Sequence, residues 1–442
     1  MKTNKHKQSG QNLYSKAKQI IPGGTQLLSK RPEMFLPNLW PSYYSKAKGY
    51  NVWDLDGNKF IDFATMGIGA CSLGYADSFV NKKVKEAISN GSMSTLNCHE
   101  EVELAERLIN LHPWSDMARF SRGGGEACSI AARIARASSG KDKILFCGYH
   151  GWHDWYISAN IESKSNLNAQ LLSVLDSAGI PSNLEGTSIP FLYNNIDMVK
   201  SLVKKYRGQI AAIFMEPVRA NEPKDDFLQE IRQICDKEKI ILIFDEVTSG
   251  FRKNPGGVHL NYKVNPDIAV FGKALGNGFP ISAVIGRSKI MKYAQDTFIS
   301  STFWTERVGY VAAIATIEKF VKNKVHNHLI KMGKEVNKIW TKAAIKADIN
   351  ISIDGLEPLT HINFLEDDAS KIQTIYTQEM LKRGFLTGSS VYTSYAYDKV
   401  AIKKFNKAIN DVFMILKIAK ESGRIDNFID SEEKHSGFKR LT

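Results

Sequence analysis

The sequence is poor in cysteine, and no two of its cysteines form a Cys-x-x-Cys pair. The five are Cys71, Cys98, Cys128, Cys147 and Cys235. An odd number of scattered thiols in a chain of 442 residues argues against a disulfide framework. We therefore expect reduced thiols and a cytoplasmic protein.

Long apolar runs and a leader-like N-terminus are also absent. No uninterrupted apolar stretch approaches the roughly 20 residues that a bilayer-spanning helix needs. Residues 1–11 are polar and contain no apolar segment of the kind found in signal peptides. We therefore expect a soluble protein that has no membrane partner.

A basic stripe is missing as well, although the formal net charge is +13. The lysines are scattered, and the one local run is Lys2, Lys5 and Lys7. Nucleic-acid footprints gather on one face of a protein, so we expect no nucleic-acid partner. With 43% hydrophobic and 24% charged residues, the composition is that of a globular protein with a sizeable core.

From about residue 99 the chain alternates amphipathic segments with short apolar runs. Four of these runs are rich in β-branched residues and do not alternate with polar ones: residues 144–146, 210–214, 240–244 and 268–271. Such runs are typical of strands buried on both faces of a mostly parallel sheet. Helical spacing is found at residues 101–111, 308–322, 326–347, 369–384 and 400–421.

Two of the apolar runs are followed by residues that suit a catalytic site. Asp245 comes directly after Phe244, and Lys273 comes two residues after Phe271. Ligands of open α/β sheets gather at the carboxyl ends of the strands, so we expect both side chains at one rim. A crowded, desolvated lysine has a lowered pKa and is nucleophilic. An amine that faces a carboxylate fits pyridoxal phosphate, which has an aldehyde and a basic ring nitrogen.

A glycine triplet offers a candidate phosphate cradle. Residues 123–125 precede a helical segment that starts at Glu126, and the N–H groups at a helix start bind anions. Tyr149 follows another apolar run and offers an aromatic face to a planar ring. His150 and His153 lie close by in the sequence, but no third ligand accompanies them, so we expect no metal.

Together these segments resemble the class III aminotransferase family, which includes glutamate-1-semialdehyde 2,1-aminomutase. The match is most specific in residues 242–247, in Gly250-Phe251-Arg252, in Pro266-Asp267 and in the spacing from there to Lys273. It runs from about Pro22 to residue 310 and continues more weakly to the C-terminus.

The resemblance implies an α/β fold, that of the fold type I pyridoxal-phosphate enzymes. This fold has a large domain with a mostly parallel seven-stranded sheet and a smaller α+β domain built from both chain ends. We expect residues 66–315 to form the large cofactor-binding domain. Residues 1–65 and 316–442 are then expected to form the small domain.

Two roles at the cofactor ring follow from the resemblance. Lys273 would carry pyridoxal phosphate as a Schiff base and move the proton between substrate and cofactor. Asp245 would keep the pyridine nitrogen protonated, so that the ring accepts electrons. Val247 and Tyr149 would pack on opposite faces of the ring.

The resemblance also assigns residues around the phosphate. Gly124 and Gly125 match the last two residues of the family's phosphate-binding Ser-Gly-Thr, and Asn221 matches an asparagine near the cofactor. Thr302 matches a threonine that reaches the phosphate of the neighbouring subunit. The last match implies a homodimer with shared active sites.

The departures from the family pattern lie at the phosphate and on the substrate side. The Ser and Thr hydroxyls are missing at residues 123 and 125. The aminomutase's arginine for the substrate carboxylate has no clear counterpart, which leaves Lys30, Arg31 and His150 as candidate substrate contacts. Thr302 is followed by bulkier and charged residues, and Thr393 takes the place of a glutamate.

These departures favour a two-step, ping-pong transamination from an amino-acid donor to a separate carbonyl acceptor. The alternative is intramolecular amino transfer, as in the aminomutase. A cofactor-binding scaffold without activity conflicts with the presence of both Lys273 and Asp245. A nucleotide-binding oxidoreductase conflicts with the lack of Gly-x-Gly-x-x-Gly directly after a strand.

Overall fold

The computed structural model describes residues 8–170, 175–218 and 220–437. The chain divides into two compact units, one formed by residues 78–327 and one by residues 1–77 and 328–442. The second unit is assembled from both chain ends and comprises the segments up to Asp77 and from His328 onward. The second boundary follows α11 (Arg307–Lys322), which packs on α2 (Ser78–Ser89) and α3 (Glu100–Leu111) of the large unit.

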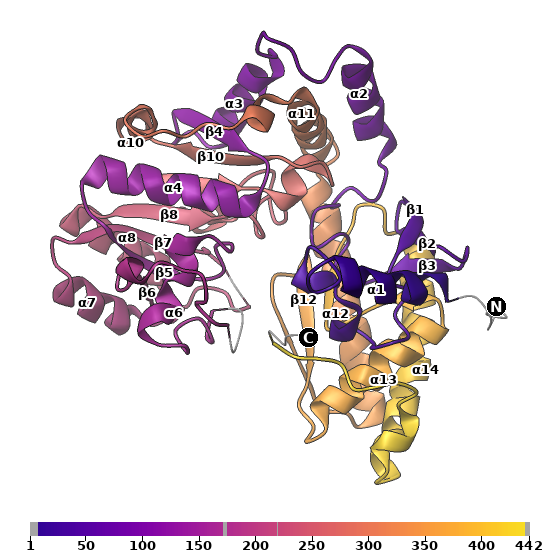
Figure 1. The fold of residues 1–442 in the computed structure, drawn as a ribbon. Coiled ribbons are helices and arrows are strands. Elements are labelled where there is room, and N and C mark those ends of the chain that lie inside the picture. The colour runs from indigo at the N-terminus through magenta and orange to yellow at the C-terminus, as the bar shows by residue number, and fades with distance from the viewer. Residues whose placement is uncertain (1–7, 171–174, 219, 438–442) are drawn as a thin grey trace. The chain divides into compact units, whose positions relative to one another are not determined.

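A seven-stranded sheet forms the centre of the large unit and confirms the predicted fold class (Figure 1). Its order is β4 (Met117–Ser121), β10 (Ser282–Gly286), β9 (Ile268–Phe271), β8 (Ile241–Asp245), β7 (Ile210–Met215), β5 (Lys143–Cys147) and β6 (Ser188–Pro190). Only β10 runs antiparallel to its neighbours. The carboxyl ends of β5, β7, β8 and β9 therefore meet at one edge.

Helices cover both faces of this sheet, which explains why its central strands are apolar without alternation. Ile144 and Phe146 of β5 pack in the core that contains α4 (Gly124–Ser139). Leu145 and Cys147 pack on the opposite face, in the core with α7 (Ile196–Lys205) and α8 (Phe227–Glu238). The shorter helices of this unit are α5 (Asp154–Ile157), α6 (Ala159–Glu162), α9 (His259–Tyr262) and α10 (Ser288–Met291).

The small unit contains two small sheets. One has the order β1 (Tyr44–Lys48), β2 (Asn51–Asp54), β3 (Lys59–Asp62) and β13 (Phe385–Leu386), and it joins the two ends of the chain. The other has the order β11 (Ile351–Asp354), β12 (Leu359–Phe364) and β14 (Ser390–Tyr392). The helices are α1 (Ser9–Ile20), α12 (Val325–Ala347), which starts just before the boundary, α13 (Ala369–Lys382) and α14 (Lys399–Glu421).

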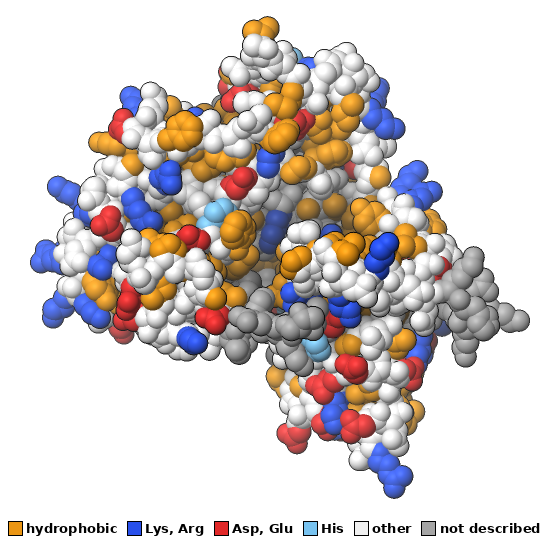
Figure 2. Space-filling view, in the orientation of Figure 1, with side chains coloured by type: hydrophobic (Ala, Val, Ile, Leu, Met, Phe, Trp, Pro, Cys, Tyr) orange, Lys and Arg blue, Asp and Glu red, His pale blue; other side chains and the backbone are white. Residues whose placement is uncertain are grey.

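Two surface properties agree with the composition. On the face seen in Figure 2, lysine and arginine side chains are scattered among acidic and uncharged ones. Within the described residues, no helix combines the length and the apolar character needed to span a membrane.

Candidate active site

Asp245 is held at the end of β8 by three donors. It is 3% exposed, and its Oδ2 accepts hydrogen bonds from His150 Nδ1 at 2.8 Å and from Cys128 Sγ at 3.4 Å. Its Oδ1 accepts from the backbone N–H of Val247 at 2.9 Å. A carboxylate fixed in this way keeps one orientation and presents a negative charge at the edge of the sheet.

Cys128 remains a thiol in this environment. Burial raises the pKa of the Cys128 thiol well above its ordinary value, and the negative charge of Asp245 raises it further. The protonated sulfur therefore donates to the carboxylate. Ligand atoms of Cys128, His150 and Asp245 lie within 4.8 Å of one another, as in many metal sites, and their mutual hydrogen bonds account for this proximity.

Lys273 lies at the end of the neighbouring strand, two residues after Phe271, the last residue of β9. Burial lowers the pKa of its ammonium group; the charge of Glu216 opposes this shift, and the charge of Arg252 adds to it. Its Nζ donates to Thr248 Oγ1 at 2.8 Å. The backbone of Lys273 has a φ of 41°, a conformation that costs a residue with a side chain about 1–3 kcal/mol and is often found at functional sites.

The glycine triplet lies at the start of α4, beside Val247. A Cβ atom added to Gly124 would lie 2.9 Å from Val247 Cγ1, and one added to Gly272 would lie 3.4 Å from the same atom. Because both residues are glycines, Val247 packs directly against the start of α4 and the end of β9. Of the residues predicted for the cofactor, Gly124 and Val247 therefore lie side by side.

Tyr149 follows β5 at the same edge of the sheet. The residue is 38% exposed, and its ring meets Tyr156 edge to face, with 6.0 Å between the ring centroids. Its backbone N–H donates to Glu216 Oε2 at 3.4 Å, so the end of β7 contributes a carboxylate as well. An aromatic face and three charged groups, on Glu216, Asp245 and Lys273, are therefore distributed over neighbouring strand ends.

Other predicted residues lie outside this group. Asn221 and Thr302 are exposed, and among the described residues no hydrogen bond joins either side chain to Asp245 or Lys273. Lys30 is exposed and Arg31 is partly buried, and both belong to the small unit. These four residues keep their predicted roles as proposals.

His150 does not fit the predicted role of a substrate contact. Its side chain is fully buried, and its Nδ1 is engaged with Asp245. The ring stacks on Phe214 of β7 at a centroid distance of 4.5 Å. A ring enclosed in this way orients the carboxylate, because its one engaged nitrogen points to Asp245.

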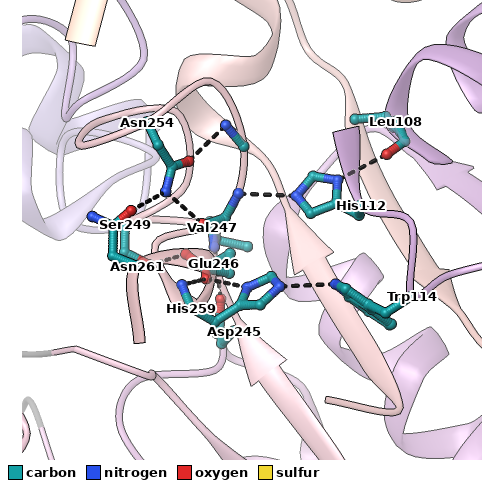
Figure 3. A network of polar contacts seen from close by, with 12 residues as sticks. Leu108, His112, Trp114, Asp245, Glu246, Val247, Ser249, Asn254, His259 and Asn261 are labelled. Carbon is teal, nitrogen blue, oxygen red and sulfur yellow. Dashed lines mark hydrogen bonds and ion pairs between the residues drawn. The ribbon is translucent and has the colours of Figure 1, made fainter. Parts of the chain in front are cut away.

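Glu246 faces the side of the sheet opposite to Asp245. It belongs to a buried hydrogen-bond network that does not include the His150–Asp245 pair (Figure 3). Its Oε1 accepts from the backbone N–H of His259 at 2.9 Å and from His259 Nδ1 at 2.8 Å. Trp114 Nε1 donates to His259 Nε2, and the N–H of Gly257 donates to His112 Nε2. These hydrogen bonds stabilise the segment between β8 and α9 on the face of the sheet opposite to Asp245.

The sequence analysis did not identify several residues of this site. Glu216 follows the apolar run of β7 directly, so the strand-end rule that selected Asp245 also applies to it. Thr248 and Cys128 carry no comparable signal. Cys128 lies on α4 and reaches Asp245 only because that helix packs across the sheet.

The arrangement fits pyridoxal phosphate by two observations. Residues 124 and 125 are glycines that lie directly against Val247 and His153, so no side chain of their own covers the N–H groups at the start of α4. Within the described chain, His150 Nε2 and His153 Nδ1 are buried polar atoms near this edge that have no hydrogen-bond partner. A partly buried amine, an oriented carboxylate and a helix start are the three groups that this cofactor requires.

The fold and the site thus define a pyridoxal-phosphate-dependent transferase of fold type I. Residues 37–402 match the family model of the class III aminotransferases, and the chain belongs to this family. It is 31% identical over 382 residues to the 3-aminobutyryl-CoA aminotransferase of Cloacimonas acidaminovorans, covering 84% of this chain and 88% of the relative. It is 34% identical over 365 residues to the glutamate-1-semialdehyde 2,1-aminomutase of Methanothrix thermoacetophila, covering 80% and 82%.

Solved structures show the same fold. The FumI protein of Sphingopyxis sp. MTA144, in its PLP internal aldimine form, has a TM-score of 0.85 at 24% identity, covering 96% of this chain and 98% of that one. An omega-transaminase from Sphaerobacter thermophilus has a TM-score of 0.82 at 22% identity, covering 92% and 98%.

Proposed function

We propose that the enzyme moves an amino group from an amino donor to a separate carbonyl acceptor, with pyridoxal phosphate held by Lys273. One observation carries the proposal: two suitable groups lie at neighbouring strand ends. One is the Lys273 amine, whose pKa is lowered, and the other is the Asp245 carboxylate, which accepts hydrogen bonds from three donors. When bound, the cofactor supplies an electron sink for the carbanion that forms when the substrate loses a proton.

Each side chain of this site has a separate proposed role. Lys273 holds the cofactor's aldehyde carbon and then, as a free amine, moves the substrate proton. Asp245 keeps a proton on the ring nitrogen, and His150 and Cys128 orient Asp245. Val247 and Tyr149 enclose the ring, and Asn221 lies near it. Lys30 or Arg31 is the proposed contact for an acidic group of the substrate.

Transfer between two molecules is favoured over intramolecular transfer by the substrate-side departures. The chain lacks a clear counterpart of the aminomutase's carboxylate-binding arginine and carries bulky, charged residues after Thr302. A relative of similar identity is named as an aminotransferase acting on 3-aminobutyryl-CoA. We therefore infer that the first product leaves before the acceptor binds.

A half-reaction tests this function. Holoenzyme mixed with a donor alone is expected to release about one equivalent of carbonyl product per site and then stop until an acceptor is added. The donor panel includes 3-amino compounds, because two similar proteins are named for 3-aminobutyryl-CoA and β-phenylalanine. Efficient conversion of glutamate-1-semialdehyde to 5-aminolevulinate without a donor would instead establish the aminomutase reaction.

A homodimer with shared active sites completes the proposal. Thr302 is exposed, and so are the apolar side chains of Leu96, Phe298 and Phe303, which are 80%, 85% and 66% exposed. A second subunit that covers them would bring Thr302 to the neighbouring phosphate.

The proposed compartment is the reducing cytoplasm. The five cysteines of the chain are free in the structure, which fits this compartment.

Mixed dimers test the shared site. A heterodimer of Thr302→Ala and Lys273→Ala subunits is expected to keep one site in which Lys273 faces an intact Thr302. That site should bind pyridoxal phosphate as tightly as the wild type does. A site that binds as weakly as the Thr302→Ala homodimer would place Thr302 in its own subunit's site.

A further inference from the structure

The turn that opens α4 contains no hydroxyl side chain for a phosphate. Glu126 caps this turn, and its Oε2 accepts from the N–H groups of Arg122 and Gly123 at 3.0 and 2.8 Å. The next N–H groups, those of Gly124 and Gly125, have no acceptor within the helix. Backbone donors are therefore available to an anion, but the side-chain donors of the family's Ser-Gly-Thr are missing.

His153 occupies the place where the third residue of that motif would carry its side chain. A Cβ atom built on Gly125 would lie 3.1 Å from both Cε1 and Nδ1 of His153. Trp152 stacks on the imidazole, with 4.4 Å between ring centroids and 24° between planes, and limits its movement. The Nδ1 edge of the ring is thus held directly beside the start of α4.

The Nδ1 atom is buried and has no hydrogen-bond partner among the described residues. A buried polar nitrogen is normally paired, because leaving it unpaired costs stability. Burial lowers the pKa of His153, while the carboxylates of Glu126 and Asp154 oppose the shift. A neutral imidazole still donates through Nδ1–H, so the ring can bind a phosphate oxygen without carrying a charge.

We propose that His153 binds the phosphate of pyridoxal phosphate through Nδ1–H and replaces the hydroxyl that is missing at Gly125. The proposal rests on the cofactor site described above. It explains together the glycine at position 125, the ring that fills the freed space and the unpaired nitrogen. It also gives a phosphate-binding role to His153, a residue to which the resemblance to the family assigns no role.

Substitutions that mimic each ring nitrogen separately test the proposal. The full-length enzyme is freed of cofactor, and Kd is measured for pyridoxal phosphate and for pyridoxal, which lacks the phosphate. His153→Asn places an amide near the position of Nδ1, and His153→Gln places it near Nε2. We expect His153→Gln and His153→Ala to weaken pyridoxal phosphate binding roughly 10- to 100-fold, and His153→Asn to weaken it by less than about fivefold. Pyridoxal binding should stay the same in all three.

A rescue variant separates phosphate binding from packing. In His153→Ala/Gly125→Thr the threonine has room for its Cβ and restores the hydroxyl, so phosphate-dependent affinity should return to within a few-fold of the wild type. The exposed histidine variant His99→Asn is the matched control and should bind both ligands normally.

Each contrary outcome has a distinct meaning. Equal losses for pyridoxal phosphate and pyridoxal would show that His153 only shapes the pocket, and unchanged affinities would show that it has no role; either overturns the proposal. A wild-type protein that bound no pyridoxal phosphate would contradict the proposed function itself.

Discussion

Asp245 and Glu246 are neighbours in the sequence, and each is paired with a histidine, yet their surroundings differ. Asp245 faces the side of the sheet covered by α4 and pairs with His150, whereas Glu246 faces the opposite side and pairs with His259. Successive residues at the end of a strand point to opposite faces, which separates the two pairs.

The two carboxylate–histidine pairs differ in whether both nitrogens of the histidine ring have hydrogen-bond partners. Both ring nitrogens of His259 are engaged, one with Glu246 and one with Trp114 (Figure 3). Around Asp245, the second nitrogen of His150 is buried and has no partner among the described residues. A closed network stabilises the fold, whereas an open one beside a reactive lysine is typical of a ligand site. The comparison assigns catalysis to one carboxylate and support to the other.

Among substitutions around the two carboxylates, the largest effect is expected from Asp245→Asn. A neutral amide cannot stabilise the protonated ring nitrogen, so kcat should fall by about two orders of magnitude or more. Affinity for pyridoxal phosphate should change far less, and the thermal midpoint only slightly. Near-normal kcat at saturating cofactor would reduce Asp245 to a binding residue and remove the contrast with Glu246.

Glu246→Gln should show the opposite pattern. It removes a buried charge that three donors satisfy, from His259 and Ser249, and should lower the free energy of unfolding by about 1–3 kcal/mol. The folded variant should keep kcat within a few-fold, as measured at a temperature well below its unfolding midpoint. A loss of kcat as large as that of Asp245→Asn, without a loss of stability, would reverse the two assignments.

The pH dependence of stability sharpens the same contrast. Burial raises the pKa of Glu246, but the hydrogen bonds from His259 and Ser249 outweigh burial and hold the pKa below its ordinary value. A lowered folded-state pKa adds stability that is present above the unfolded-state pKa, about 4.3, and is lost as the pH falls through the folded-state pKa. The stability difference between wild type and Glu246→Gln, from urea unfolding, should therefore shrink below about pH 4. A difference that stayed constant down to pH 3 would contradict this account.

The smallest effect is expected from Cys128→Ala. The thiol donates one weak, 3.4 Å hydrogen bond to Asp245, so its loss should lower kcat by only a few-fold and leave KM nearly unchanged. Cys128→Ser, which restores a donor, serves as the control and should recover most of the activity. A loss above about 50-fold in Cys128→Ala would show that the thiol does more than orient Asp245.

The fold could be predicted from the sequence because its central strands are continuous apolar runs. The runs of β5, β7, β8 and β9 were recognisable, and the strand-end rule then selected Asp245 and Lys273. Three strands of this sheet were not recognised: β4 (MARFS), which carries polar residues, β6 (SIP), which has only three residues, and β10 (SAVIG).

Contacts between distant elements could not be predicted from the sequence. The buried position of His150 depends on stacking with Phe214, and the role of Cys128 depends on how α4 crosses the sheet. His153 appeared in the sequence only as half of a weak metal signal. Its place beside Gly125 is visible only in three dimensions.

The most direct test of the account is the identity of the lysine that carries the cofactor. Holoenzyme is reduced with borohydride, digested and mapped by mass spectrometry, and Lys273→Ala is assayed in parallel. We expect the cofactor mass on the peptide that contains Lys273, and a folded Lys273→Ala variant without turnover. A modified peptide that contained a different lysine, or a Lys273→Ala variant with the wild-type rate, would contradict the central claim.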